Sequence, residues 1–358
     1  MIDKAFMKVS MTKQSPLHFY VGTYTDAPSD SHGVVGIALD PQSGVLTLNN
    51  EIVPDTLQQQ HNPSYLASTQ NGLYTFNEVD RHSGAQLHFS DNKTRCSLAI
   101  AGDYPCHIDV KDKLLAVANY GSGNVAVYGL DEEGQPAECI ADLFVDGCGP
   151  NVDRQKAPHA HQVTFLEHTN QLAVVDLGSD CIYFYDYDVN SLSFALNQTL
   201  NMPAGSGPRH LVFSHDESIG YVVCELSETL VVITKQNGCW EQASQQALLA
   251  NEENKQAASA IYLSPDERFL YVSCRAQNKI SYFNVDGDNV TQLAAIDCGG
   301  AFPRDFVISQ NGEWLLVANQ HSSDIVSYHR NVETGAIKAT GYSCKVGAPV
   351  CLIEMLSR

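Results

Sequence analysis

Short apolar runs recur along the chain, and polar turns separate them. In the segment GPRHLVFSHDESIGYVVCELSETLVVI, which begins at Gly207, two such runs flank the turn SHDES. Short apolar runs that are rich in β-branched residues and bounded by turn residues are typical of β-strands. This segment therefore predicts an antiparallel hairpin. Its first strand opens on an Arg-His pair, and its second strand closes on Glu225.

The same order of features recurs at intervals of about 42 to 53 residues. The copies begin with NPSYLAS at Asn62, YPCHIDV at Tyr104, APHAHQV at Ala157, GPRHLVF at Gly207, AASAIYL at Ala257, FPRDFVI at Phe302 and APVCLIE at Ala348. The last copy lacks its second and third strands, and LHFYVGTYTD and GVVGIALD near the N-terminus supply candidates for both. A repeat of this length fits a four-stranded antiparallel blade. We therefore predict an all-β fold, a seven-bladed β-propeller whose ring is closed by N- and C-terminal strands in one blade.

The repeat also sets the domain boundaries. We predict one propeller domain over residues 17–358, preceded by a disordered extension over residues 1–16. The polar tracts Gly129 to Ala157 and Asn237 to Lys255 are expected to hold outermost strands and loops. A large β-sandwich or barrel would explain the strands. It would not explain a repeat that starts at one end of the chain and finishes at the other, so we favour the propeller.

The composition limits the partners. The chain has 21 Lys and Arg against 41 Asp and Glu, a formal net charge of −20. Nucleic acid and anionic membranes attract positive surfaces, so neither is expected as a partner, whereas a small anionic ligand is not excluded. No apolar run approaches the roughly 20 residues of a membrane span, and the first residues lack the apolar core of a signal peptide. We predict a cytoplasmic, reduced protein that is a monomer or a weak homo-oligomer.

Polar residues gather at one end of the predicted inner hairpins. The start of the first strand and the end of the second strand meet at the same rim of a blade. The candidates at this rim are Glu78, His107, Asn119, His161, Asp176, Arg209, His210, Glu225, Arg275 and Arg304. Because the innermost strands of a propeller surround a central channel, these positions should converge on a ligand site. Hydration of strand ends is a sufficient explanation for Asn119, but a weaker one for Arg209, Glu225 and Arg275.

His161 is the best candidate for a proton-transfer group, since the ordinary pKa of histidine lies near neutrality. Asp176 is placed at the adjoining strand end, where it could orient His161. His159 lies in the same PHAHQV segment, so either histidine could face the channel. For His107 and His210, a satisfied hydrogen bond at a strand end is a serious alternative.

The arginines at the rim offer planar forks for a carboxylate or a phosphate. Arg209 and Arg275 are the main candidates, and Arg304 extends the positive zone. Glu225, across the hairpin from Arg209, could hold that guanidinium or act as a second acid or base. The alternative is a plain cross-strand ion pair, which contributes little if exposed.

Other chemistries find less support in the sequence. It contains no GxSxG elbow, Walker loop, HExxH motif or EF-hand loop. A calcium site built from Glu78, Asp176, Glu225 and nearby asparagines is the second choice. We rank it lower because arginines at the same rim would repel a cation, and we predict neither a metal nor a cofactor.

The motifs GPRHLVFS followed by CELS, SPDERFLYVSCR, FPRDFVIS with LLVANQ, and YPCH with ANYGSGNV resemble the lactonase family of seven-bladed propellers. The resemblance runs from about Leu17 to the C-terminus, in a family that includes cycloisomerase-type bacterial 6-phosphogluconolactonases and fungal carboxy-cis,cis-muconate lactonizing enzymes. The family's active-site His, Arg, Glu and second Arg fall by motif on His161, Arg209, Glu225 and Arg275. The chain departs from the pattern at AASA in the fifth copy and at the acidic insert VDGCGPNVDRQK, which could reshape the pocket mouth.

The resemblance implies metal-free hydrolysis of 6-phospho-glucono-1,5-lactone in the pentose phosphate pathway. In that mechanism Arg209, Arg275 and Arg304 bind the phosphate and polarise the lactone carbonyl, while His161 or Glu225 takes a proton from the attacking water. Alternatives are a carboxy-muconate lactonizing cycloisomerase, a lactonase for another acid, or, in a different class, a non-catalytic propeller that binds a protein partner on its rim.

Overall fold

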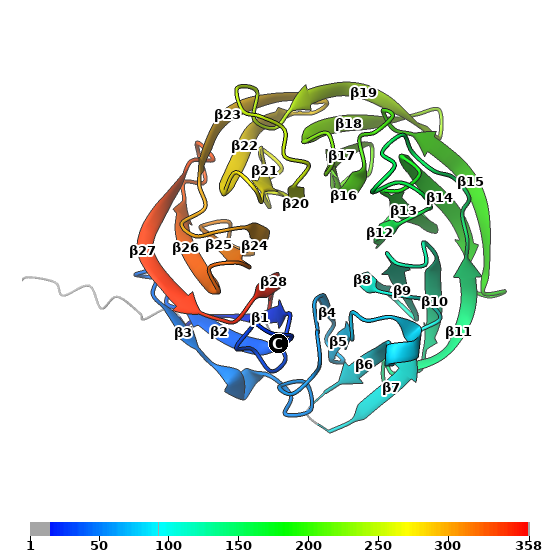
Figure 1. Ribbon diagram of the computed structural model, residues 1–358, viewed down its shortest axis with the longest axis horizontal. Helices are drawn as coiled ribbons and strands as arrows, with labels where there is room; N and C mark the ends of the chain where they lie inside the picture. Colours follow the sequence, from blue (N-terminus) through cyan, green and yellow to red (C-terminus); the bar gives the residue numbers. More distant parts are fainter. Residues whose placement is uncertain (1–14, 92, 357–358) are drawn as a thin grey trace, which may run out of the picture.

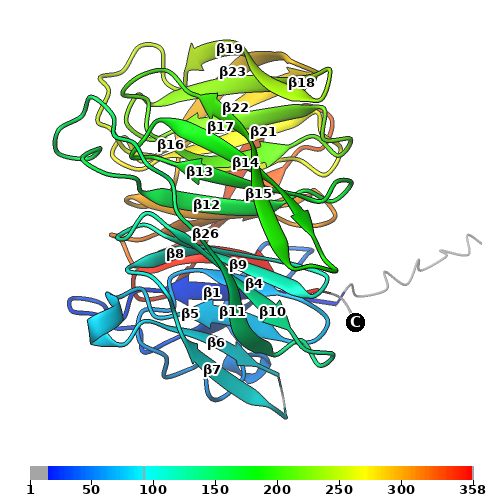
Figure 2. The ribbon, with the colours of Figure 1, turned by 90° about the vertical axis from the view of Figure 1, so that its right-hand side faces the viewer.

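The computed structural model describes residues 15–91 and 93–356, and in that part of the chain 28 strands form seven four-stranded antiparallel sheets. The sheets are arranged as blades around a central axis (Figure 1). Viewed edge-on, the ring carries connecting loops on both of its faces (Figure 2). The predicted seven-bladed propeller is confirmed. Residues 1–14 of the predicted N-terminal extension lie outside the described residues, within which no helix is long and apolar enough to cross a membrane.

The strands occupy four positions from the axis outward. The innermost strands are β4 (Leu66–Ser68), β8 (Pro105–Lys111), β12 (Ala160–Phe165), β16 (Pro208–Phe213), β20 (Ala258–Leu263), β24 (Pro303–Ile308) and β28 (Pro349–Glu354). The second strands are β1 (Leu17–Thr23), β5 (Leu73–Phe76), β9 (Leu114–Asn119), β13 (Gln171–Asp176), β17 (Ile219–Cys224), β21 (Phe269–Cys274) and β25 (Trp314–Asn319). The third strands are β2 (Val35–Leu39), β6 (Gln86–Ser90), β10 (Val125–Leu130), β14 (Cys181–Asp188), β18 (Thr229–Gln236), β22 (Lys279–Asp286) and β26 (Asp324–Arg330). The outermost strands are β3 (Leu46–Leu48), β7 (Arg95–Ala99), β11 (Pro136–Leu143), β15 (Ser193–Asn201), β19 (Cys239–Ala247), β23 (Asn289–Asp297) and β27 (Ile337–Lys345). Two short 3₁₀ helices, η1 (Asn50–Ile52) and η2 (Arg81–Ser83), lie in connections.

One blade joins the two ends of the fold. Its sheet has the order β28-β1-β2-β3, and β28 pairs antiparallel with β1, with Tyr20 opposite Ile353. The strands near the N-terminus therefore complete the blade that β28 begins, as the truncated seventh repeat predicts. The outer strands β11 and β19 fall within the two polar tracts expected to hold them.

The core lies between the blades. Among the described residues, seven hydrophobic clusters form, one between each pair of neighbouring blades. In β9, Ala116 and Ala118 belong to one cluster, while Leu115 and Val117 belong to the next. Because alternate residues of a strand face opposite sides of a sheet, a blade packed on both faces requires an almost continuous apolar run. The outer strand β23 instead alternates exposed with partly buried residues, as a strand at the rim of the ring should.

The innermost strands share a distortion that positions side chains. In six blades the ladder between the first two strands shifts register near the start of the innermost strand. The residues left at these β-bulges are Cys106, His161, Arg209, Arg304 and Val350, and in β20 the irregular stretch is Ser259 with Ala260. A bulge inserts one extra residue into a strand and re-aims its side chain, and bulges are frequent next to active sites. The six bulges therefore form a ring of equivalent positions around the axis.

Candidate active site

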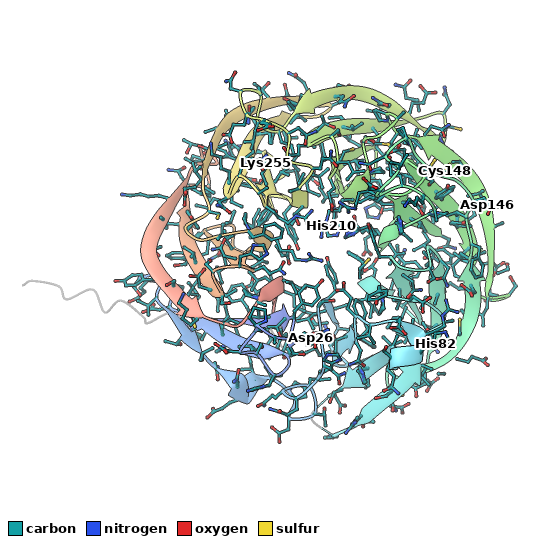
Figure 3. All side chains as sticks on the ribbon, in the orientation of Figure 1. Asp26, His82, Asp146, Cys148, His210 and Lys255 are labelled. Carbon is teal, nitrogen blue, oxygen red and sulfur yellow. The ribbon has the colours of Figure 1, made fainter. Side chains whose placement is uncertain are left out.

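A small cavity on the axis is lined by the bulge residues of five blades. Its walls are formed by Ser64, Tyr65, Glu78, Cys106, His161, Arg209, His210, Arg304, Asp305 and Val350. His210, which follows the bulge of β16, lies at the centre of the ring (Figure 3). The predicted convergence of strand ends from distant parts of the sequence is therefore present in the structure.

The structure corrects the register of the third repeat. Matching the motif PHAH to PRH in the next copy predicts that His161 is level with His210, but His161 occupies the bulge and so matches Arg209. The proline of each motif is not at an equivalent position. Pro208 is the first residue of β16, whereas Pro158 precedes the first residue of β12 by two positions. Counting back from the hairpin would give the correct register, since Phe165 and Phe213 are equivalent and each lies four residues after its bulge.

The same correction removes Asp176 from the rim. Asp176 pairs with Ala160 and is fully buried, and the residue level with Glu225 is Leu177. The Asp176 Oδ1 atom accepts hydrogen bonds from the backbone N–H groups of His159 and Ser179, at 3.1 and 2.8 Å. A one-residue shift turns a strand side chain to the opposite face. Asp176 therefore caps the turn after β13, and the expectation that it orients His161 is wrong.

Glu225 is the centre of a buried cluster of charges. Its Oε2 atom lies 3.1 Å from Arg209 Nε and 2.9 Å from Arg275 Nη2. Its Oε1 atom lies 2.8 Å from Arg154 Nη2. Arg275 also donates to the carbonyl oxygens of Ala257 and Ala258. Glu225 thus connects arginines from three different parts of the sequence.

Neighbouring charges together affect the pKa of Glu225 more strongly than burial does. Burial alone would raise the pKa of Glu225, but Arg275, Arg209 and Arg154 together lower it to about 2. Burial and then the neighbouring Arg275 lower the pKa of Arg209 to about 10, so its guanidinium is still charged at neutral pH. One carboxylate therefore faces three guanidinium groups, which makes the site locally positive in a chain of formal net charge −20.

The variant Glu225→Gln is expected to lower the free energy of unfolding by about 3–5 kcal/mol, because it leaves two buried guanidinium groups without a counter-charge. Denaturant unfolding measures the change. The matched control is Glu132→Gln. Glu132 also faces a cation, the Lys113 ammonium 3.9 Å away, but both side chains are exposed, so the loss of this pair should change stability little. Equal unfolding midpoints for the two variants would contradict a stabilising role for Glu225.

Glu78 belongs to a second polar cluster on the opposite wall. Tyr24 Oη lies 2.9 Å from both carboxylate oxygens of Glu78 and accepts a 2.9 Å hydrogen bond from Arg304 Nη2. Burial raises the pKa of Tyr24 well above its ordinary value, so its hydroxyl keeps its proton. Burial lowers the pKa of Arg304, but Tyr24 and Glu78 outweigh it, and the guanidinium is charged. Arg304 thus brings a further positive charge to the cavity.

The two histidines of the PHAHQV segment have different surroundings. His161 lines the cavity, is 6% exposed, and its Nδ1 atom has no hydrogen-bond partner among the described residues. His159 stacks on the ring of Tyr120, and its Nδ1 atom bonds the Tyr120 backbone oxygen at 2.7 Å. Burial, followed by Arg209 and Arg304, holds the pKa of His161 well below 6.5, so its imidazole is neutral at pH 7.

The other predicted residues divide into two groups. The ring centroid of His107 lies 4.3 Å from that of Tyr65 and 5.5 Å from that of His210. Burial, followed by the charge of Arg209, lowers the pKa of His107 to about 3. These neutral aromatic rings fill the axis beside the cavity. Asn119, by contrast, is fully buried against Gly102 and is absent from the cavity wall.

Arg154 is a residue of the charged cluster that the strand pattern does not predict. This residue lies in the insert between β11 and β12, outside the repeat on which the alignment of strand ends depends. The feature of the sequence that could have pointed to Arg154 is the insert, because it directly precedes the strand that carries His161. In Figure 3, the insert residues Asp146 and Cys148 mark its path inward from the edge of the ring.

The carboxylates proposed for a calcium site bond to other groups. Glu225 is held by guanidinium groups, Glu78 by Tyr24 and Asp176 by backbone amides. No group of three or more His, Cys, Asp or Glu residues in the described part of the chain is arranged to hold a metal ion. The geometry therefore favours an anion rather than a cation as the ligand.

Comparisons with known proteins extend over the whole propeller. The Lactonase, 7-bladed beta-propeller family matches residues 18–354. A Bacillus subtilis (strain 168) protein named 6-phosphogluconolactonase is 29% identical over 347 residues, covering 93% of this chain and 97% of its own length. A Formosa agariphila protein of the same name is 29% identical over 339 residues, covering 89% and 94%. The solved structure of a periplasmic gluconolactonase from Pseudomonas aeruginosa has a TM-score of 0.84 at 29% identity, covering 96% of this chain and 99% of that one.

Proposed function

This chain belongs to the Lactonase, 7-bladed beta-propeller family, and from that membership we propose that it hydrolyses 6-phospho-glucono-1,5-lactone to 6-phosphogluconate. The observation that supports the proposal best is the cluster at the axis, where Glu225 holds the buried guanidinium groups of Arg209 and Arg275. Arg209 and the neutral His161 line the same cavity. An anionic ester with a reactive carbonyl matches this combination of charge and base. The relatives named 6-phosphogluconolactonase support the same choice of substrate.

The reaction needs a base, an oxyanion site and a proton for the leaving group. Water adds to the lactone carbonyl carbon while His161 takes one of its protons. Arg209 and Arg275 stabilise the oxyanion that forms on the carbonyl oxygen. The bond from that carbon to the ring oxygen then breaks, and the ring oxygen takes the proton from His161. The acid product releases one proton to solution, so the sum is lactone plus water to carboxylate plus a proton.

Glu225 is the weaker candidate for the base. A carboxylate with a pKa of about 2 has little tendency to take a proton at neutral pH. Because Glu225 contacts three guanidinium groups, we assign it the role of holding these arginines in position. We therefore assign proton transfer to His161, whose Nδ1 atom has no partner among the described residues.

The proposed nucleophile is water rather than a side chain. Cys106 is the one thiol on the cavity wall, and burial raises its pKa well above the ordinary value. A protonated thiol is a poor nucleophile. The absence of a GxSxG elbow in the sequence agrees with this assignment.

Two related activities are the alternatives. The structural neighbour named periplasmic gluconolactonase favours a lactone without a phosphate. A cycloisomerase that forms or opens a lactone on a carboxylated muconate would use the same charges. A cytoplasmic location, a place in the pentose phosphate pathway, and a monomeric or weakly oligomeric state are part of the proposal for the phosphorylated substrate.

The test compares the rates at which the wild-type protein opens three lactones: 6-phospho-glucono-1,5-lactone, glucono-1,5-lactone and a carboxylated muconolactone. We expect the phosphorylated lactone to open well above its spontaneous rate and with the highest kcat/KM of the three. The rate should be unchanged by a chelator, since no step uses a metal. Loss of activity with chelator and recovery with calcium would contradict the mechanism, and a higher kcat/KM for another lactone would contradict the choice of substrate.

A further inference from the structure

The insert that carries Arg154 is anchored by a buried side chain. Gln155 is fully buried, and its Nε2 atom donates to the Leu177 carbonyl and to Asp180 Oδ1, at 2.9 and 2.7 Å. Its Oε1 atom accepts a hydrogen bond from the Asn151 backbone N–H. The amide of Gln155 thus ties the insert to the turn that follows β13. The backbone next to Arg154 is therefore fixed before a ligand arrives.

Arg154 is the outermost of the three arginines on Glu225. Its side chain is 37% exposed, against 4% for Arg209 and 9% for Arg275. Both of its side-chain hydrogen bonds are donated by Nη2, to Glu225 Oε1 and to Tyr120 Oη at 2.8 and 3.2 Å. No described residue accepts from its Nε or Nη1 atoms. One edge of the guanidinium is held in place, and the other edge is available to an anion.

We propose that Arg154 is a specificity-determining residue that binds the phosphate of the substrate, while the buried Arg209 and Arg275 act on the lactone carbonyl. This inference rests on the proposed lactonase function. In 6-phospho-glucono-1,5-lactone the carbonyl carbon and the carbon that carries the phosphorylated arm flank the ring oxygen, so the carbonyl and the phosphate project in different directions and can contact different arginines. A phosphate dianion loses less hydration beside a partly exposed arginine than beside a buried one.

Three physical features suit Arg154 to this task. Glu225 shares its single negative charge among three guanidinium groups, so Arg154 retains attraction for an added anion. Because Glu225 and Tyr120 already order the side chain, binding costs little conformational entropy. A guanidinium fork also matches the geometry of phosphate oxygens better than an ammonium does.

The test measures kcat/KM of Arg154→Gln on two substrates that differ only in the phosphate, 6-phospho-glucono-1,5-lactone and glucono-1,5-lactone. We expect a 10- to 100-fold loss on the phosphorylated lactone, the size of a lost charge-assisted hydrogen bond. The loss on glucono-1,5-lactone should be at least tenfold smaller. Arg154→Lys should recover part of the loss on the phosphorylated substrate. The control is Arg81→Gln, because Arg81 is a half-exposed arginine paired with Asp103 away from the cavity wall.

Equal losses on the two lactones would overturn the inference, because they would show that Arg154 only positions Glu225. No loss on either lactone would overturn it as well. If the wild-type protein opens neither lactone, the lactonase function fails, and calorimetric binding of 6-phosphogluconate and gluconate decides on Arg154 separately. Tighter binding of 6-phosphogluconate by the wild type, lost in Arg154→Gln, supports a phosphate site. Equal affinities for the two acids reject it.

Discussion

Replacing both Arg209 and Arg275 by alanine is expected to reduce lactone hydrolysis to the spontaneous rate. In the proposed mechanism each guanidinium donates to the developing oxyanion, and loss of one such donor costs about 10²- to 10³-fold. Together they should cost about 10⁴-fold or more. The measurement is the initial rate of acid release from 6-phospho-glucono-1,5-lactone, corrected for the reaction without protein.

Single variants separate catalysis from folding in this experiment. Arg209→Lys and Arg275→Lys keep a positive charge beside Glu225, so the buried carboxylate stays paired, but they lose the planar fork. We expect each to unfold at a denaturant concentration close to the wild type and to lose activity. The control Arg81→Ala with Arg268→Ala removes two half-exposed arginines and should leave the rate unchanged. Full activity in the Arg209 and Arg275 double variant would refute the lactonase mechanism.

His161→Gln is expected to lower kcat by about 10²- to 10⁴-fold, the usual contribution of a positioned general base. KM should change much less, because the arginines that attract the anion remain. The matched control is His168→Gln, since His168 is exposed and its ring contacts His215 rather than the cavity residues. Equal rates for His161→Gln and the wild type would show that another group acts as the base.

The pH profile gives a second test of His161. The base acts in its neutral form, and burial with the nearby arginines holds its pKa well below 6.5. Protonation therefore sets in only as the pH falls through this lowered pKa. The wild-type kcat/KM, which reports the ionisation of the free protein, should stay level from neutral pH to below 6.5 and fall only at lower pH. A decline centred at 6.5 would indicate a solvated histidine instead.

The propeller can be predicted from the sequence because each blade repeats one pattern. LLVAN in β25 and LLAVAN in β9 are continuous apolar runs, and blades packed on both faces require such runs. The offset between the first and last copies identifies the closing blade, which β28 and β1 form. Period and order are properties of the chain alone, so no structure is needed to find them.

Two parts of the site differ in how far the sequence predicts them. The bulge position of His161 can be found by counting back from its hairpin, although the Pro158 motif points to the wrong neighbour. The contact between Arg154 and Glu225 depends on the path of an insert that has no counterpart in the other blades. The position of Arg154 therefore follows from tertiary packing, which the repeat does not encode.

The pairing of β28 with β1 also sets an order of events during synthesis. Residues 17–23 leave the ribosome early, but their partner strand spans residues 349–354 and leaves it after every other strand of the propeller. Until then one edge of β1 is unpaired, and unpaired strand edges favour aggregation. The ring, and with it the arrangement of Val350 beside Arg304 in the cavity wall, can close only after translation of the propeller is complete.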